Sequence, residues 1–157
     1  MSLLVETVVA NGKEFDIDLP KDTKINPTLI TEALVEQPGL VAYYGELKAQ
    51  ATFSLAQVKD ELESLKARIR KSTKMKNADI KMTVQDLQDA VDMDPSVADM
   101  KEMYNEVELV YEKAAACVNA MKERGTALVT IATLARYEHS AIDTIMEETA
   151  KTSRRKG

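Results

Sequence analysis

Few side chains of this sequence have the types and spacing that catalysis requires. His139 is the single histidine and Cys117 the single cysteine. A histidine that acts as a general base needs a carboxylate to orient its ring and a substrate pocket. Glu138 is adjacent in a helical pattern, so it would point to a different face of the helix. Cys117 lies in the apolar run "AAACVNA" and is typical of a small buried residue rather than a nucleophile. We therefore expect no catalytic residue and no enzymatic activity.

The sequence also predicts no metal ion and no cofactor. One cysteine and one histidine do not supply the four ligands of a zinc site. The aspartates at 86, 89, 92, 94 and 99 lack the alternating ligands and central glycine of a calcium loop. We interpret these aspartates as solvated helix faces and as charges near helix N-termini. Neither of the two glycine-rich phosphate-binding patterns, G-x-x-x-x-G-K-[ST] and G-x-G-x-x-G, occurs.

A cluster of basic residues is the feature that most clearly indicates a function. The chain has a formal net charge of −5, yet residues 66–76 hold six basic side chains and no acidic one. Residues 86–112, in contrast, hold nine acidic side chains and one basic residue, Lys101. Charge blocks of this kind favour an interaction protein over an enzyme. The six basic residues are Lys66, Arg68, Arg70, Lys71, Lys74 and Lys76.

Two interpretations of this basic stretch remain open from the charge pattern. In the first, the cations complement the dipole at the end of a long helix and neutralise the acidic stretch, within a subunit or between subunits. In the second, they bind the phosphate backbone of a nucleic acid. No aromatic residue lies between 65 and 81, so base stacking is not indicated. The second interpretation therefore predicts sequence-tolerant backbone contacts that gain strength when repeated around a homo-oligomer.

The N-terminal residues predict a β-hairpin. Val5, Thr7 and Val9 alternate with more polar neighbours, and so do Phe15, Ile17 and Leu19. Asn11-Gly12 lies between the two runs and suits a type I′ turn, which needs positive φ at both positions. Because an isolated hairpin is marginally stable, we expect it to pack on a helix or on a neighbouring subunit.

The rest of the sequence predicts helices. After a linker over 19–27, Asn26-Pro27 should begin a short helix that ends near Gln37, with Pro38-Gly39 as the interruption. A long helix is expected over 39–72 and a loop over 73–82. Gly45 lies inside that helix, where it costs stability or permits a close contact. Nine residues form its apolar stripe: Leu40, Tyr44, Leu47, Ala51, Leu55, Val58, Leu62, Leu65 and Ile69.

The second half of the chain repeats this pattern. Thr83 and Asp86 predict a capping box for a short helix that ends near Met93. Asp94-Pro95 should start a long helix that ends at Arg124, with Gly125 as its stop. A last helix is expected over 126–150, followed by a frayed basic tail over 151–157. The apolar heptad positions are Val97, Met100, Tyr104, Val107, Tyr111, Ala114, Val118 and Met121.

The predicted fold is mainly α: two long antiparallel helices with short flanking helices, plus an N-terminal β-hairpin. We divide the chain into a hairpin appendage (1–22), a helical core (23–125), and a C-terminal helix with its basic tail (126–157). Apolar surface in excess of the core predicts self-association. One cysteine fits a reducing cytoplasm, and no apolar run is long enough to span a membrane.

The order of these elements resembles the UvsY-type recombination mediator proteins of tailed bacteriophages over roughly 25–140. The corresponding segments are "INPTLITEALVEQPGLVAYYGEL", "SLKARI", "TVQDLQDAVDMDPSVADM" and "EVELVYEKAAACVNAMKERG". The resemblance implies a small accessory protein without catalytic activity that acts in the cytoplasm, which is that of the host cell if the protein is phage-encoded. It also implies a ring-like homo-oligomer that binds single-stranded DNA without sequence preference. Such proteins help a RecA-like recombinase displace single-strand-binding protein.

The same resemblance implies DNA binding for the helical core and oligomerisation for the C-terminal helix. It also implies positions for the DNA-binding site. The family's basic motif corresponds to Lys66 and Arg68, and proximity extends the site to Arg70, Lys71, Lys74 and Lys76. The Asn-Gly hairpin, Thr126 in place of an aromatic residue, and the longer C-terminus depart from the family pattern. These departures concern the ring interface more than the DNA-binding role. The alternative function is a coiled-coil scaffold or inhibitor that binds a protein through its acidic helix and hairpin.

Overall fold

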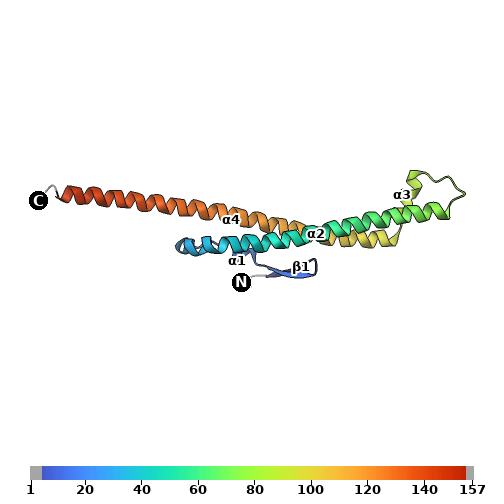
Figure 1. Cartoon of the computed structure of the whole chain (residues 1–157), viewed down its shortest axis with the longest axis horizontal. Helices are drawn as coiled ribbons and strands as arrows, with labels where there is room; N and C mark the ends of the chain where they lie inside the picture. The colour runs from blue at the N-terminus through green and yellow to red at the C-terminus, as the bar shows by residue number, and fades with distance from the viewer. Residues whose placement is uncertain (1–4, 155–157) are drawn as a thin grey trace.

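The fold is built on two long antiparallel helices. The computed structural model describes the backbone of residues 5–154 and the side chains of residues 5–148. Figure 1 shows α2 and α4 as two rods, with the hairpin against the first half of α2 and α3 at the other end. The elements are β1 (Glu6–Ala10), β2 (Lys13–Ile17), α1 (Leu19–Asp22), the short 3-10 helix η1 (Pro27–Leu29), α2 (Ile30–Lys76), α3 (Val84–Asp92) and α4 (Pro95–Arg154).

The predicted hairpin is confirmed, and it packs on helices of its own subunit. Asn11 and Gly12 have φ values of 51° and 73°, as a type I′ turn requires. The strands pair antiparallel, with Ala10 opposite Lys13 and Val8 opposite Phe15. Four hairpin side chains belong to the main core, together with residues of α2 and α4. They are Val8, Ala10, Phe15 and Ile17.

The alternation of Val5, Thr7 and Val9 does not mark the buried face of the first strand. Val5 and Val9 are exposed, whereas Val8 and Ala10 are buried. The two-residue turn sets the register and places Val8 on the same face as Phe15. Since Phe15 is buried against the helices, Val8 must be buried with it.

Helix α2 does not stop at Pro38, so the predicted interruption is wrong. Asn26 does cap the chain before Pro27, and its side-chain oxygen accepts a hydrogen bond from the amide of Thr28. From Ile30, however, a single helix of 47 residues runs to Lys76 with Pro38 inside it. Gln37 donates a hydrogen bond to the Met121 carbonyl at 2.6 Å. Packing against α4 therefore offsets the lost hydrogen bond of the proline.

Helix α4 likewise continues through Gly125, so the predicted stop at this residue is wrong. One helix of 60 residues runs from Pro95 to Arg154, past the predicted end at 150. A Cβ atom at Gly125 would lie 3.1 Å from Nε2 of Gln37. Gly125 therefore permits the close approach of α2 and α4, and it does not terminate the helix. Residues 155–157 of the predicted tail lie outside the described residues.

The predicted start signals of α3 and α4 are confirmed. Thr83 and Asp86 form the complete capping box of α3. The Asp94 carboxylate accepts a hydrogen bond from the Ser96 amide at 2.9 Å. Val91 of α3 packs with Leu62 of α2 and Val97 of α4 in a second apolar cluster. This cluster fixes α3 beside the C-terminal end of α2.

The predicted apolar stripes form the helix interface. None of the nine stripe residues of α2, and none of the eight heptad positions of α4, is exposed. Gly45 is not a close-contact site, because a Cβ atom there would meet nothing within 4 Å. Within the described part of the chain, no helix has a stretch long and apolar enough to cross a membrane.

Candidate nucleic-acid interface

All six predicted cations lie on the last turns of α2. Lys74 and Lys76 belong to the helix, so the loop predicted over 73–82 begins four residues later, at Asn77. The helix ends at Lys76, and Asn77 caps it. The side-chain amide of Asn77 donates to the Thr73 carbonyl at 2.9 Å, and its backbone amide donates to the same oxygen at 3.2 Å. Residues 66–76 contain no glycine or proline, and lysine and arginine favour helix. The cations therefore also lie where they complement the helix dipole.

The structure does not bring the six cations to one face. Successive residues of an α-helix are about 100° apart around its axis, so Lys66 and Arg68 project about 200° apart. Lys66, Arg70 and Lys74 follow one line at intervals of four residues. The basic residues thus surround the end of the helix rather than forming one flat patch.

Three of the cations form an exposed arc on the solvent side of α2. Arg68, Lys71 and Lys74 are exposed and follow one another at intervals of three residues. They project away from Leu62 and Ile69, which face the second apolar cluster. In the described part of the chain, none of the three forms an ion pair with a carboxylate.

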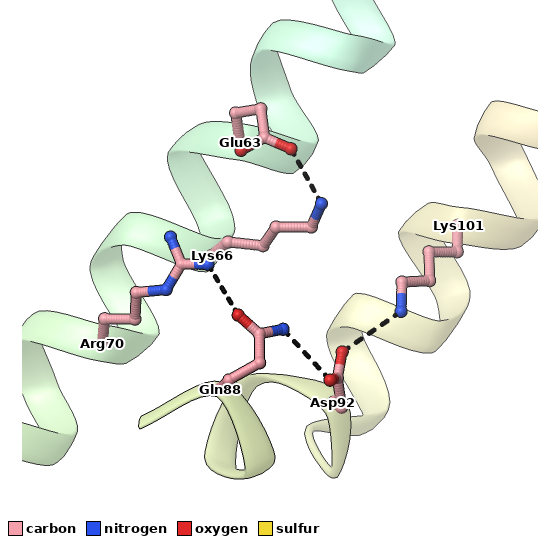
Figure 2. Close-up of polar contacts among 6 residues, drawn as sticks. All are labelled: Glu63, Lys66, Arg70, Gln88, Asp92 and Lys101. Atoms are coloured by element: carbon pink, nitrogen blue, oxygen red, sulfur yellow. Dashed lines mark hydrogen bonds and ion pairs between the residues drawn. The ribbon is translucent and has the colours of Figure 1, made fainter. Parts of the chain in front are cut away.

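Lys66 and Arg70 are held by neighbouring side chains, as Figure 2 shows. Lys66 forms an ion pair with Glu63 of its own helix at 2.7 Å, and its side chain is 19% exposed. Arg70 donates to the side-chain oxygen of Gln88 on α3 at 2.9 Å. These two cations therefore contribute to local structure before any ligand binds.

Gln88 connects Arg70 to the acidic stretch without a direct ion pair. Its amide nitrogen donates to Asp92 at 3.0 Å, and Asp92 pairs with Lys101 of α4 at 3.4 Å. Figure 2 shows this chain of contacts across α2, α3 and α4. The sequence reasoning missed Gln88, although its position four residues before Asp92 is a recognisable hydrogen-bonding spacing.

The contacts also lower the pKa values of two carboxyl groups. The hydrogen bond and charge of Lys66 lower the pKa of Glu63 below its ordinary value. The hydrogen bond from Gln88, together with Lys101, lowers the pKa of Asp92. Both carboxylates therefore remain ionised at neutral pH, and Glu63 competes with any external anion for Lys66.

Across the described part of one subunit, the acidic stretch and the basic stretch are not joined by direct ion pairs. Among the residues that the structure describes, no ion pair joins a cation of 66–76 to an acid of 86–112. The one ion pair of that acidic stretch, Asp92 with Lys101, lies within it. Within the described residues, the neutralisation interpretation thus has the contact through Gln88 and a weak electrostatic effect of Lys66 on Asp92 to support it.

The residues considered for catalysis lie apart from one another. Cys117 is buried in the main core, as predicted, and burial raises the pKa of its thiol. His139 is exposed on the distal part of α4. In the described part of the chain, no group of three or more histidine, cysteine, aspartate or glutamate residues is placed to hold a metal ion.

The fold places the chain in a class of mostly helical proteins with a long antiparallel helix pair and an N-terminal two-stranded hairpin. A solved structure of similar fold is that of the bacteriophage T4 recombination mediator protein UvsY, with a TM-score of 0.61 and 17% sequence identity. The match covers 76% of this chain and 92% of that chain. No protein-family model and no curated protein matches the sequence. The resemblance drawn from the sequence is therefore supported at the level of the fold.

Proposed function

We propose that this protein is a recombination mediator that binds single-stranded DNA without sequence preference and helps to load a RecA-like recombinase. The fold is similar to that of a phage recombination mediator, which supports this role. The further partners in this proposal are single-strand-binding protein and other copies of the chain in a ring-like homo-oligomer. The role needs neither catalysis nor a cofactor, and it fits the cytoplasm of a host cell.

The observation that carries the proposal is the exposed arc of Arg68, Lys71 and Lys74. These side chains are free of intramolecular ion pairs within the described residues, so they are available to phosphate groups. Lys66 and Arg70 must first give up contacts with Glu63 and Gln88. We therefore assign the main DNA contact to the arc, with Lys66, Arg70 and Lys76 as secondary contacts.

The proposed mechanism depends on repetition of weak contacts. Each phosphate contact contributes little by itself, and its strength falls with salt. Several copies of the arc around one oligomer would raise the effective concentration of binding sites along a strand. A strand held in this way would be extended and accessible to the recombinase.

Fluorescence anisotropy with labelled oligo-dT at several salt concentrations tests this function. The Arg68→Ala/Lys71→Ala variant should bind more weakly and reduce the slope of log K against log[salt] by about 1.4, since each single-strand phosphate contact contributes about 0.7. The matched control is Lys122→Ala/Arg136→Ala, which removes one lysine and one arginine from exposed positions of α4. This control should retain both the affinity and the slope.

A wild-type protein that does not bind oligo-dT at about 50 mM salt would overturn the proposal. That result would favour the scaffold or inhibitor function, in which the acidic helix and hairpin bind a protein. Two observations favour this second candidate. Asp99, Glu102 and Glu106 are exposed on α4 and form no ion pair among the described residues. Val5 and Val9 are exposed on the outer face of the hairpin.

A further inference from the structure

Arg124 of α4 is a buried cation without an anionic partner. The residue is 6% exposed, where α4 passes the first turns of α2. Its Nη1 atom donates to the carbonyl oxygen of Ala33 at 3.4 Å and to the side-chain oxygen of Gln37. Within the described chain, no carboxylate lies within ion-pair distance of its guanidinium group. A buried charge of this kind is costly unless another group compensates it.

The unused donors of Arg124 are the pair that best recognises an oxyanion. Its Nε atom is buried and has no hydrogen-bond partner within the described chain. Its Nη2 atom likewise donates no hydrogen bond to a described residue. The N–H groups of Nε and Nη2 are nearly parallel, and they can bind two oxygens of a phosphate or carboxylate at once. A buried donor such as Nε is normally satisfied, so its vacancy points to a ligand.

Arg124 lines a cavity of about 380 Å³ between α1, α2 and α4. Lys21 and Lys24 line the same cavity and are both exposed. The cavity also contains Asp22 and Glu36. Asp22 accepts a hydrogen bond from the Tyr44 hydroxyl at 2.7 Å, which positions this carboxylate but leaves its charge in place. The cavity therefore combines three cationic groups, one of them buried, with the two carboxylates of Asp22 and Glu36, which leaves a formal charge of +1 on its lining.

We propose that this cavity is a binding site for a phosphate group, with Arg124 as the buried recognition residue and Lys21 and Lys24 as cations at the rim. The guanidinium and the two ammonium groups could together contact three oxygens, which a phosphate offers and a single carboxylate does not. The phosphate belongs to a small molecule or to a nucleic-acid backbone. This site lies about 45 Å along α2 from the cations at its C-terminal end, because some 30 residues separate Glu36 from Lys66. The inference is therefore independent of the proposed DNA contact.

Isothermal titration calorimetry of the full chain with sodium phosphate, at an ionic strength held constant with chloride, tests the site. Wild type should show saturable binding. Arg124→Lys keeps a cation but loses the paired donors, so binding should weaken at least tenfold. Lys21→Ala/Lys24→Ala leaves every contact of Arg124 in place and should weaken binding roughly three- to tenfold. This second variant keeps the test valid if substitution of Arg124 prevents folding. Lys122→Ala, outside the cavity, should bind as wild type does.

Two further titrations distinguish the source of the phosphate. If the ligand is a small molecule, thymidine monophosphate should compete with phosphate, and Arg124→Lys should leave oligo-dT binding unchanged. If the ligand is a nucleic-acid backbone, phosphate should weaken oligo-dT binding and Arg124→Lys should lower its affinity. Absence of saturable phosphate binding by wild type would overturn the inference. Acetate that binds as tightly as phosphate would also overturn it, in favour of a carboxylate ligand.

Discussion

At the scale of single residues, hydrogen bonds to exposed carboxylates make the fold sensitive to acid. The backbone amide and hydroxyl of Thr83 lower the pKa of Asp86, and Ser96 lowers the pKa of Asp94. Gln88 and Lys101 lower the pKa of Asp92. All three carboxylates hold the ends of α3 or the start of α4. Their protonation would thus act on the same part of the molecule.

We expect stability to fall as the pH drops below about 4. The pKa values of Asp86 and Asp94 are lower in the folded state than in the unfolded state, where they are about 3.9. The two carboxylates therefore contribute to folding stability above this pH. The contribution is lost as the pH falls through the folded-state pKa values. Urea unfolding at pH 7, 4 and 3 measures this. Asp94→Asn retains a capping acceptor but does not titrate, so it should show a smaller loss. An unchanged urea midpoint between pH 7 and 3 would contradict the prediction.

Cys117 should be chemically inert in the folded protein. The side chain is 2% exposed, and burial raises the pKa of its thiol, so little reactive thiolate forms. Ellman's reagent at pH 8 should label it slowly in native protein and rapidly in guanidinium chloride. Rapid labelling under native conditions would show that the core opens around α4.

At the scale of the elements, two glycines in long helices should respond differently to alanine. Gly45→Ala should stabilise the protein by up to about 1 kcal/mol, because the new methyl group meets no other atom within 4 Å. Gly125→Ala gains the same helix propensity but must displace Gln37, which donates to Met121. We therefore expect a smaller gain or a loss. Urea denaturation of both variants measures the difference.

Sequence periodicity predicted the helix pair, but local signals gave wrong helix ends. Apolar stripes extend over many turns, so one irregular residue does not hide them. Pro38 and Gly125 are ordinary breakers in a sequence taken alone. Here the two residues lie in neighbouring turns of facing helices, where Gln37 and Arg124 join α2 to α4. That compensation depends on residues about 87 positions apart and is not visible in a local pattern.

The candidate site could be predicted in part. The density of positive charge from Lys66 to Lys76 was visible in the sequence. Which of these cations contact other side chains, and which do not, was not visible. This difference depends on Glu63 and Gln88, which belong to different helices. Arg124 was interpreted as a helix end, and its burial follows from the continuation of α4. The face of β1, however, could have been derived from the two-residue turn and the position of Phe15.

At the scale of the whole molecule, the second half of α4 extends beyond the start of α2, as Figure 1 shows. Several large apolar side chains on this half are more than half exposed, among them Leu134, Tyr137 and Ile142. Exposed apolar surface of this extent is typical of an interface. It agrees with the oligomerisation helix expected over 126–150, which stays a prediction.

Light scattering after size-exclusion chromatography should therefore give a mass well above the 17.4 kDa of one chain. Leu134→Asp/Ile142→Asp should shift the protein to a monomer, because charged residues are costly at an apolar interface. Glu138→Gln, on the same segment, provides a control that removes no apolar side chain. A wild-type monomer at all concentrations would contradict self-association and would remove the avidity on which the proposed mechanism depends.

The continuity of α4 has a consequence for amide hydrogen exchange. Backbone amides before Gly125 lie in turns supported by α2, whereas those near Leu134 and Ile142 lie in turns whose side chains are exposed. Most of the stability of a helix in a protein comes from tertiary packing, which this exposed segment lacks. In a lone protomer, deuterium uptake should rise steeply along one unbroken helix. Slow uptake throughout that helix would reveal that the distal half is covered, and the exchange profile would locate the covering surface residue by residue.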